Sequence, residues 1–165
     1  MRYASTALGA LLLSLVAVPA MAALSSEDKT FATKASAGGQ AEVAFGQLAK
    51  ENASSPAVKQ FGERMVTDHT QANEELMQIA KSQDLNLPKG LDAKHQAKEK
   101  QFSTTKGVAF DKAYMQDMVQ DHEQDVADFR KEAQHGQDPQ LKAFAAKYLP
   151  VLEKHLQMAQ SITLE

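Results

Sequence analysis

Two short motifs place a histidine in the same local setting twice. Residues 65–69 and 118–122 both read Met-Val-x-Asp-His, so His69 and His122 each follow an aspartate. Histidine is the commonest metal ligand among protein side chains. A single histidine on the apolar face of a helix is more often a hydrogen-bonded core residue than a ligand. The motif by itself therefore leaves metal binding and core packing both open.

Each of four long amphipathic patterns carries one such residue on its apolar face: Glu42, His69, His122 and His155. At roughly 1.5 Å of rise per residue from the intervening turns, Glu42 and His69 lie within about one helical turn in height, and so do His122 and His155. A buried carboxylate needs a partner. One carboxylate and three imidazoles suit Zn, Fe, Mn or Cu. This coincidence favours a transition-metal site in the core.

Three aspartates are candidates for supporting roles. Asp125 follows His122 by one turn on the same face, which makes it a possible additional ligand. Asp68 and Asp121 point about 100° away from the histidines that follow them. We expect each to accept a hydrogen bond from an imidazole of a neighbouring helix. His95 stands among lysines and is not expected to be a ligand.

Methionines share the faces of the three histidines. Met65 and Met118 precede His69 and His122 by four residues, and Met158 follows His155 by three. Thioethers with imidazoles suit Cu(I). Methionine is also a common core filler at helical spacing, and we favour that interpretation.

Four long helices and one short helix must position these residues. Ser25 is expected to cap the first helix with Asp28 as its capping-box partner. Glycines that share a face with Glu42 predict close approach of a neighbouring helix, and Pro150 predicts a bend before His155. The expected helices span residues 25–51, 56 to about 84, 92 to about 104, roughly 109–134, and 138–162.

The connections between these helices indicate the fold. Tight turns join the first helix to the second and the fourth to the fifth, while a long connection holds the short helix. The chain is rich in Ala, Gln, Lys, Glu and Asp and sparse in Val and Ile, which favours helix over sheet. The sequence thus predicts an all-α, ferritin-like four-helix bundle of two antiparallel hairpins, with a short extra helix in the long crossover.

The N-terminus predicts export. A basic start, an apolar run and Ala20-Met21-Ala22 make residues 1–22 typical of a cleaved signal peptide, followed by one domain over 23–165. We expect a periplasmic protein with no membrane span after cleavage. The absence of cysteine excludes thiolate ligands and disulfides. The net charge of −3 without a basic block argues against nucleic acid. Envelope protein partners and the oligomeric state stay open.

An ordered set of motifs resembles the bacterial family called domain of unknown function 4142. The resemblance covers about residues 29–162 and implies a ferritin-like bundle in the bacterial envelope, without an established activity. Proteins of the wider ferritin-like group bind two metals through Glu and Glu-x-x-His residues. Here Val66, Val119 and Leu152 stand three residues before the histidines, which fits a mononuclear site better. The motifs are Gly38-Gly39-x-x-Glu42-Val43, Phe61-Gly62-x-x-Met65-Val66-x-Asp68-His69, Phe110-Asp111-x-x-Tyr114, Met118-Val119-x-Asp121-His122, Leu149-Pro150 and His155-Leu156.

Three functions remain in competition at this stage. The first is transition-metal binding through Glu42, His69, His122 and His155. The second is a structural or interaction module of the envelope, in which the histidines form a hydrogen-bonded polar core without metal. The third is an oxidoreductase, which needs an open metal position and a substrate path. No phosphate-binding loop, nucleophile elbow or other catalytic motif is found in the sequence.

Overall fold

The computed structural model describes residues 23–163, and within them the chain is all-α. The predicted signal peptide lies outside the described residues. The second helix is shorter at its C-terminus than predicted and the fourth begins two residues earlier, at Gly107. The helices are α1 (Ser26–Asn52), α2 (Pro56–Ser82), α3 (Ala93–Thr104), α4 (Gly107–His135) and α5 (Pro139–Thr163).

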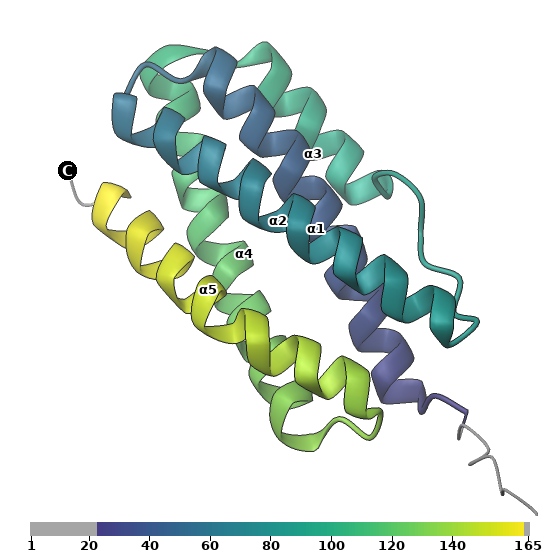
Figure 1. The fold of residues 1–165 in the computed structure, drawn as a ribbon. Coiled ribbons are helices and arrows are strands. Elements are labelled where there is room, and N and C mark those ends of the chain that lie inside the picture. The colour runs from purple at the N-terminus through teal and green to yellow at the C-terminus, as the bar shows by residue number, and fades with distance from the viewer. Residues whose placement is uncertain (1–22, 164–165) are drawn as a thin grey trace, which may run out of the picture.

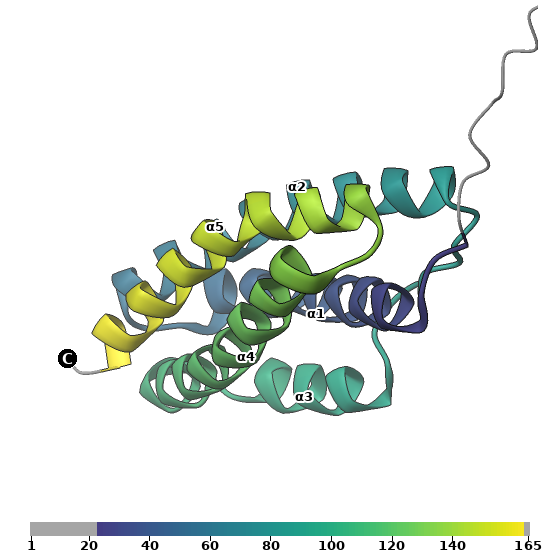
Figure 2. The same cartoon turned by 90° about the horizontal axis from the view of Figure 1, so that it is seen from below.

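The four long helices pack as two hairpins, α1 with α2 and α4 with α5 (Figure 1). The hairpins meet through α1 against α4 and α2 against α5. Helix α3 crosses over the outer face that α1 and α4 form (Figure 2). Its Phe102 is 1% exposed, and its ring centroid lies 5.2 Å from that of Phe45. The short helix therefore contributes to the core, although its sequence is mostly polar.

The core divides into two apolar clusters with a polar layer between them. One cluster contains Phe61 and Met118 and fills the end of the molecule near the α1–α2 turn. The other contains Phe129 and Phe144 and fills the end near the α4–α5 turn. Along α2, α4 and α5 the histidines stand between the stretches that feed the two clusters. The polar layer is consequently sealed by apolar side chains above and below.

Helix α1 begins as predicted, but its capping box is not formed. The Ser25 hydroxyl oxygen accepts a hydrogen bond from the Asp28 backbone N–H at 3.0 Å. The Asp28 carboxylate does not complete the box, because it accepts hydrogen bonds from the backbone N–H groups of Gln137 and Asp138 at 3.0 and 3.1 Å. A residue expected to act locally thus joins α1 to the α4–α5 turn.

Glu132 lies beside Asp28 in this joint and predicts a pH-dependent stability. Burial, followed by the Asp28 charge, raises the pKa of Glu132 from 4.5 to about 7. A carboxyl whose pKa is raised on folding stabilises the protein below its unfolded pKa, and this contribution is lost as pH rises through the folded value. Glu132→Gln is therefore expected to gain stability over wild type between pH 5 and pH 8, by about 1–3 kcal/mol. Urea unfolding at both pH values measures this difference.

Glu123→Gln is the matched control for Glu132→Gln, because Glu123 is an exposed glutamate on the same helix. Its stability relative to wild type should not change between pH 5 and pH 8. A Glu132→Gln variant whose difference from wild type is equally flat would contradict the buried, protonated state of Glu132.

Helices α1 and α2 approach each other at two glycines. A Cβ built on Gly46 would lie 2.7 Å from the Gly62 carbonyl oxygen, and one built on Gly62 would lie 2.7 Å from the Ala49 Cβ. Both distances are too short for any side chain. The close approach predicted for this face of α1 is confirmed. Separately, none of the helices within residues 23–163 is both long and apolar enough to cross a bilayer.

Candidate metal centre

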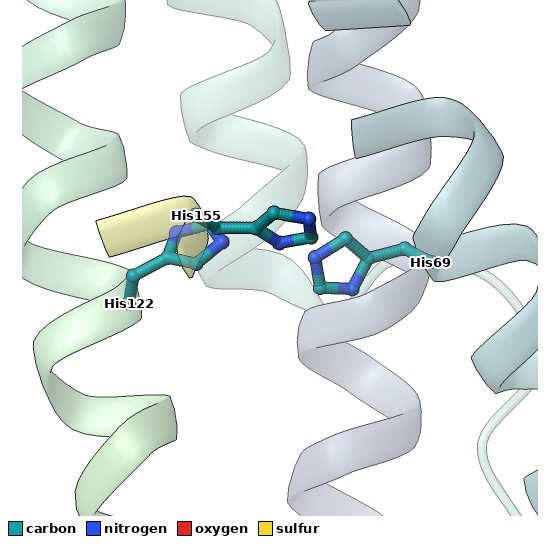
Figure 3. A group of neighbouring side chains, drawn as sticks. All are labelled: His69, His122 and His155. Atoms are coloured by element: carbon teal, nitrogen blue, oxygen red, sulfur yellow. The ribbon is translucent and has the colours of Figure 1, made fainter. Parts of the chain in front are cut away.

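Three histidines from three helices meet in the polar layer. His69 comes from α2, His122 from α4 and His155 from α5, and Figure 3 shows their rings turned toward one another. One nitrogen of each ring lies within 4.8 Å of the other two. The side chains are buried, with exposed fractions of 6%, 0% and 1%. Tetrahedral bonds of about 2.0–2.1 Å hold ligand nitrogens about 3.4 Å apart, so a modest approach of the rings would complete a three-histidine site.

The hydrogen bonds of the rings identify which nitrogens are free. His122 Nδ1 lies 2.9 Å from the Met118 carbonyl oxygen, so Nδ1 carries the proton and donates it. His155 Nε2 lies 2.8 Å from Asp68 Oδ2 and donates in the same way. His122 Nε2 and His155 Nδ1 are then bare acceptors, and both are buried without a hydrogen-bond partner. His69 Nε2 is also buried without a partner.

Asp68 belongs to α2 but holds a histidine of α5. Its carboxylate accepts from His155 Nε2 and also pairs with Arg64 Nη1 at 3.4 Å. The sequence predicted that this aspartate would contact an imidazole of a neighbouring helix, and the hydrogen bond exists. An Asp–His bond of this kind fixes the ring and makes its other nitrogen a better donor to a metal.

The three imidazoles are neutral near pH 7. Burial, together with the nearby His155, lowers the pKa of His122 to about 4. Burial also holds the pKa of His69 well below its usual value, with His122 and His155 adding to the effect. For His155, burial lowers the pKa although the bond to Asp68 opposes it. Neutral rings offer their lone pairs without competition from protons, as metal binding requires.

Glu42 lies next to His122 but not among the three converging nitrogens. Glu42 Oε1 is 3.6 Å from His122 Nδ1, the nitrogen that already donates to Met118. Oε2 is buried and has no hydrogen-bond partner. Burial, with the charges of nearby aspartates on α4, raises the pKa of Glu42 well above its usual value. Glu42 therefore lies on the side of the His122 ring that carries the protonated Nδ1, and not on the side of the bare Nε2.

The remaining predicted residues lie around the centre. Asp125 lines a small cavity with His69 and His155, and burial raises its pKa to about 7. Asp121 faces α3. Burial raises its pKa, and Lys94 and Lys98 of α3 oppose the shift only in part. Asp121 forms no hydrogen bond with a histidine within residues 23–163, so the structure does not bring it to an imidazole as it does Asp68.

His95 lies outside the three-histidine group. Its side chain is only 14% exposed and pairs with Asp92, so it is not the surface histidine that the polar sequence around it suggested. Met65 and Met118 are fully buried in the apolar cluster that contains Phe61. Their burial fits the interpretation of these methionines as core fillers.

Sequence reasoning missed two residues that shape the centre. The ring of Phe61 lies 6.2 Å from that of His122 and 6.5 Å from that of His155, edge to face, so it closes one side of the group. Asn73 lines the cavity on the other side. It follows His69 by four residues, and this one-turn spacing is the signal that could have identified it.

Comparison with known proteins adds a family but no activity. The chain matches the family described as "Domain of unknown function (DUF4142)" over residues 14–162. No curated protein and no solved structure gives a significant match. Since the match covers most of the sequence, including all three histidines, this chain belongs to the DUF4142 family.

Proposed function

We propose that this protein binds one transition-metal ion in its core through His69, His122 and His155. The observation that carries the proposal is the set of three buried ring nitrogens, one from each histidine, that have no hydrogen-bond partner. A buried polar atom without a partner costs about 1–3 kcal/mol. Three such atoms, on rings that face one another, would therefore destabilise the folded protein if nothing bound to them. A metal ion satisfies all three at once.

The donor set indicates the class of metal. Three neutral imidazoles suit Zn, Cu and Fe, whereas Mn prefers carboxylate oxygen. In this proposal the Met118 carbonyl holds His122 and the Asp68 carboxylate holds His155, each through the protonated nitrogen of the ring. Glu42 Oε1 lies 3.6 Å from the same nitrogen of His122. Among the described residues, the group of mutually close ligand atoms contains the three histidines and no carboxylate, which supports a mononuclear site.

The proposed setting is the bacterial periplasm. Two helical hairpins with a long connection between them have the chain order of ferritin-like bundles. The composition of residues 1–22 is typical of a signal peptide. We propose that the chain is exported as a ferritin-like domain and takes up its metal in the envelope.

The competing proposal is a structural or interaction module with a hydrogen-bonded polar core. The bonds from His155 to Asp68 and from His122 to Met118 support it. Each of these bonds satisfies only one nitrogen of its ring, however, and leaves the other buried and unpaired. The metal proposal accounts for both nitrogens.

Metal analysis of the exported, untagged protein, purified without chelators, tests the proposal. We expect about one equivalent of a transition metal per chain. After removal of that metal, the melting temperature should fall and should recover on readdition, because a ligand at 1,000 times its Kd stabilises the folded state by about 4 kcal/mol. A protein that holds no metal and shows no thermal shift with Zn, Cu, Fe or Mn supports the structural module instead.

A further inference from the structure

A cavity of about 20 Å³ adjoins the histidine group on one side. His69 and His155 line it, together with Asp125 from α4 and Asn73 from α2. Asp68 from α2 also lines it, and the rest of its wall is mainly apolar and belongs to the cluster near the α4–α5 turn, including Phe129. The cavity thus combines two of the proposed metal-binding rings with the polar side chains of Asp68, Asp125 and Asn73.

The two sides of the histidine group have different surroundings. Phe61 packs edge to face against His122 and His155 from the apolar cluster near the α1–α2 turn. The cavity lies against the opposite cluster, and His122 is not among the described residues that line it. A metal held between the three nitrogens would therefore have an aromatic ring on one side and the cavity on the other. The cavity is offset from the position that the metal itself would take.

The volume of the cavity indicates the size of the ligand that it can hold. A space of about 10–15 Å³ is needed to hold one water molecule. The volume of about 20 Å³ is therefore enough for a single water molecule. A buried water needs two to four polar partners. Asp125 and Asn73 supply hydrogen-bonding groups, and a metal ion bound at the three nitrogens would supply a further contact.

We propose that this cavity holds an exchangeable water or hydroxide as the fourth ligand of the metal, next to Asp125 and Asn73. This inference rests on the proposed metal site. It assigns that site to the open class, in which three protein ligands leave one position for water, rather than to the closed class of structural sites. The exogenous ligand is limited to the size of one water molecule. Asp125 is then a positioning residue for that water and not a metal ligand.

Pulsed electron paramagnetic resonance of the Cu(II)-loaded full-length protein in D₂O tests the assignment. We expect wild type to show the strong deuterium coupling of a water bound directly to copper, together with nitrogen couplings from histidine. Ala72→Val adds two methyl groups at the cavity wall and is expected to reduce the deuterium signal to the level of distant solvent while copper stays bound. Ala35→Val, which acts on the same cavity from α1, is the second variant in case the first is unstable.

Ala113→Val is the matched control, because Ala113 is partly buried against the other apolar cluster. It should keep the wild-type deuterium coupling. Copper bound by histidine without directly coordinated water in wild type would overturn the open position and leave the metal site intact. Failure of the protein to bind copper, zinc or iron at all would instead overturn the proposed function itself, and this inference with it.

Discussion

Replacing His122 with alanine is expected to lower the Zn(II) affinity of the protein by two to three orders of magnitude. Structural zinc sites with four ligands bind with about 10–16 kcal/mol, so one ligand contributes about 2.5–4 kcal/mol. His122 is fully buried, and its bare Nε2 has no hydrogen-bond partner among residues 23–163 that could compensate. His69→Ala and His155→Ala should lower the Zn(II) affinity by a similar factor. Competition with a chromophoric chelator at pH 7 measures the three affinities.

His95→Ala is the control for this series, since His95 is a largely enclosed imidazole that lies outside the group. Its zinc affinity should equal that of wild type. Asp68→Asn should give an intermediate result, because loss of a carboxylate that holds a ligating histidine typically costs about 10–100-fold in affinity. Equal affinities for wild type and all three alanine variants at His69, His122 and His155 would exclude these rings as the metal site.

The sequence was sufficient to predict which histidines would meet. Helical periodicity placed His69, His122 and His155 on apolar faces, and counting residues from the turns put them at matching heights. Both arguments use properties of a single helix or hairpin, which depend on local geometry. The structure brings the ring nitrogens within 4.8 Å of one another.

The position of Glu42 was not accessible by the same reasoning. Its height along α1 follows from the rise per residue, but its direction depends on how α1 is rotated against α4. That rotation depends on packing between the hairpins, to which both apolar clusters contribute. As a result Glu42 approaches the protonated nitrogen of His122 instead of the bare one.

Asp28 illustrates a second limit of the sequence. Its spacing from Ser25 fits a capping box, which is a local pattern. The backbone N–H groups of Gln137 and Asp138 lie more than a hundred residues away in the chain, and they take the carboxylate instead. A tertiary contact between α1 and the α4–α5 turn competes successfully with the local bond. The periodicity of the sequence does not predict such a contact.

The close approach of α1 and α2 predicts a large loss of stability for Gly46→Ala. The added Cβ would lie 2.7 Å from the Gly62 carbonyl oxygen, a backbone atom that cannot move without separating the helices. Overpacking of this kind costs about 1–3 kcal/mol. The gain of about 1 kcal/mol in helix propensity from glycine to alanine reduces this cost, which leaves an expected net loss of up to about 2 kcal/mol. Urea unfolding of the metal-free protein measures the net loss.

Gly38→Ala is the matched comparison on the same helix, because its Cβ would meet only Asp125 Oδ1 at 3.9 Å, an ordinary contact. This variant is expected to be more stable than wild type by about 1 kcal/mol, the propensity difference alone. Because α2 also carries His69, separating the helices at Gly46 should displace that ring and weaken zinc binding, whereas Gly38→Ala should not. Two glycine variants of equal stability and equal zinc affinity would show that the spacing of α1 and α2 does not depend on Gly46.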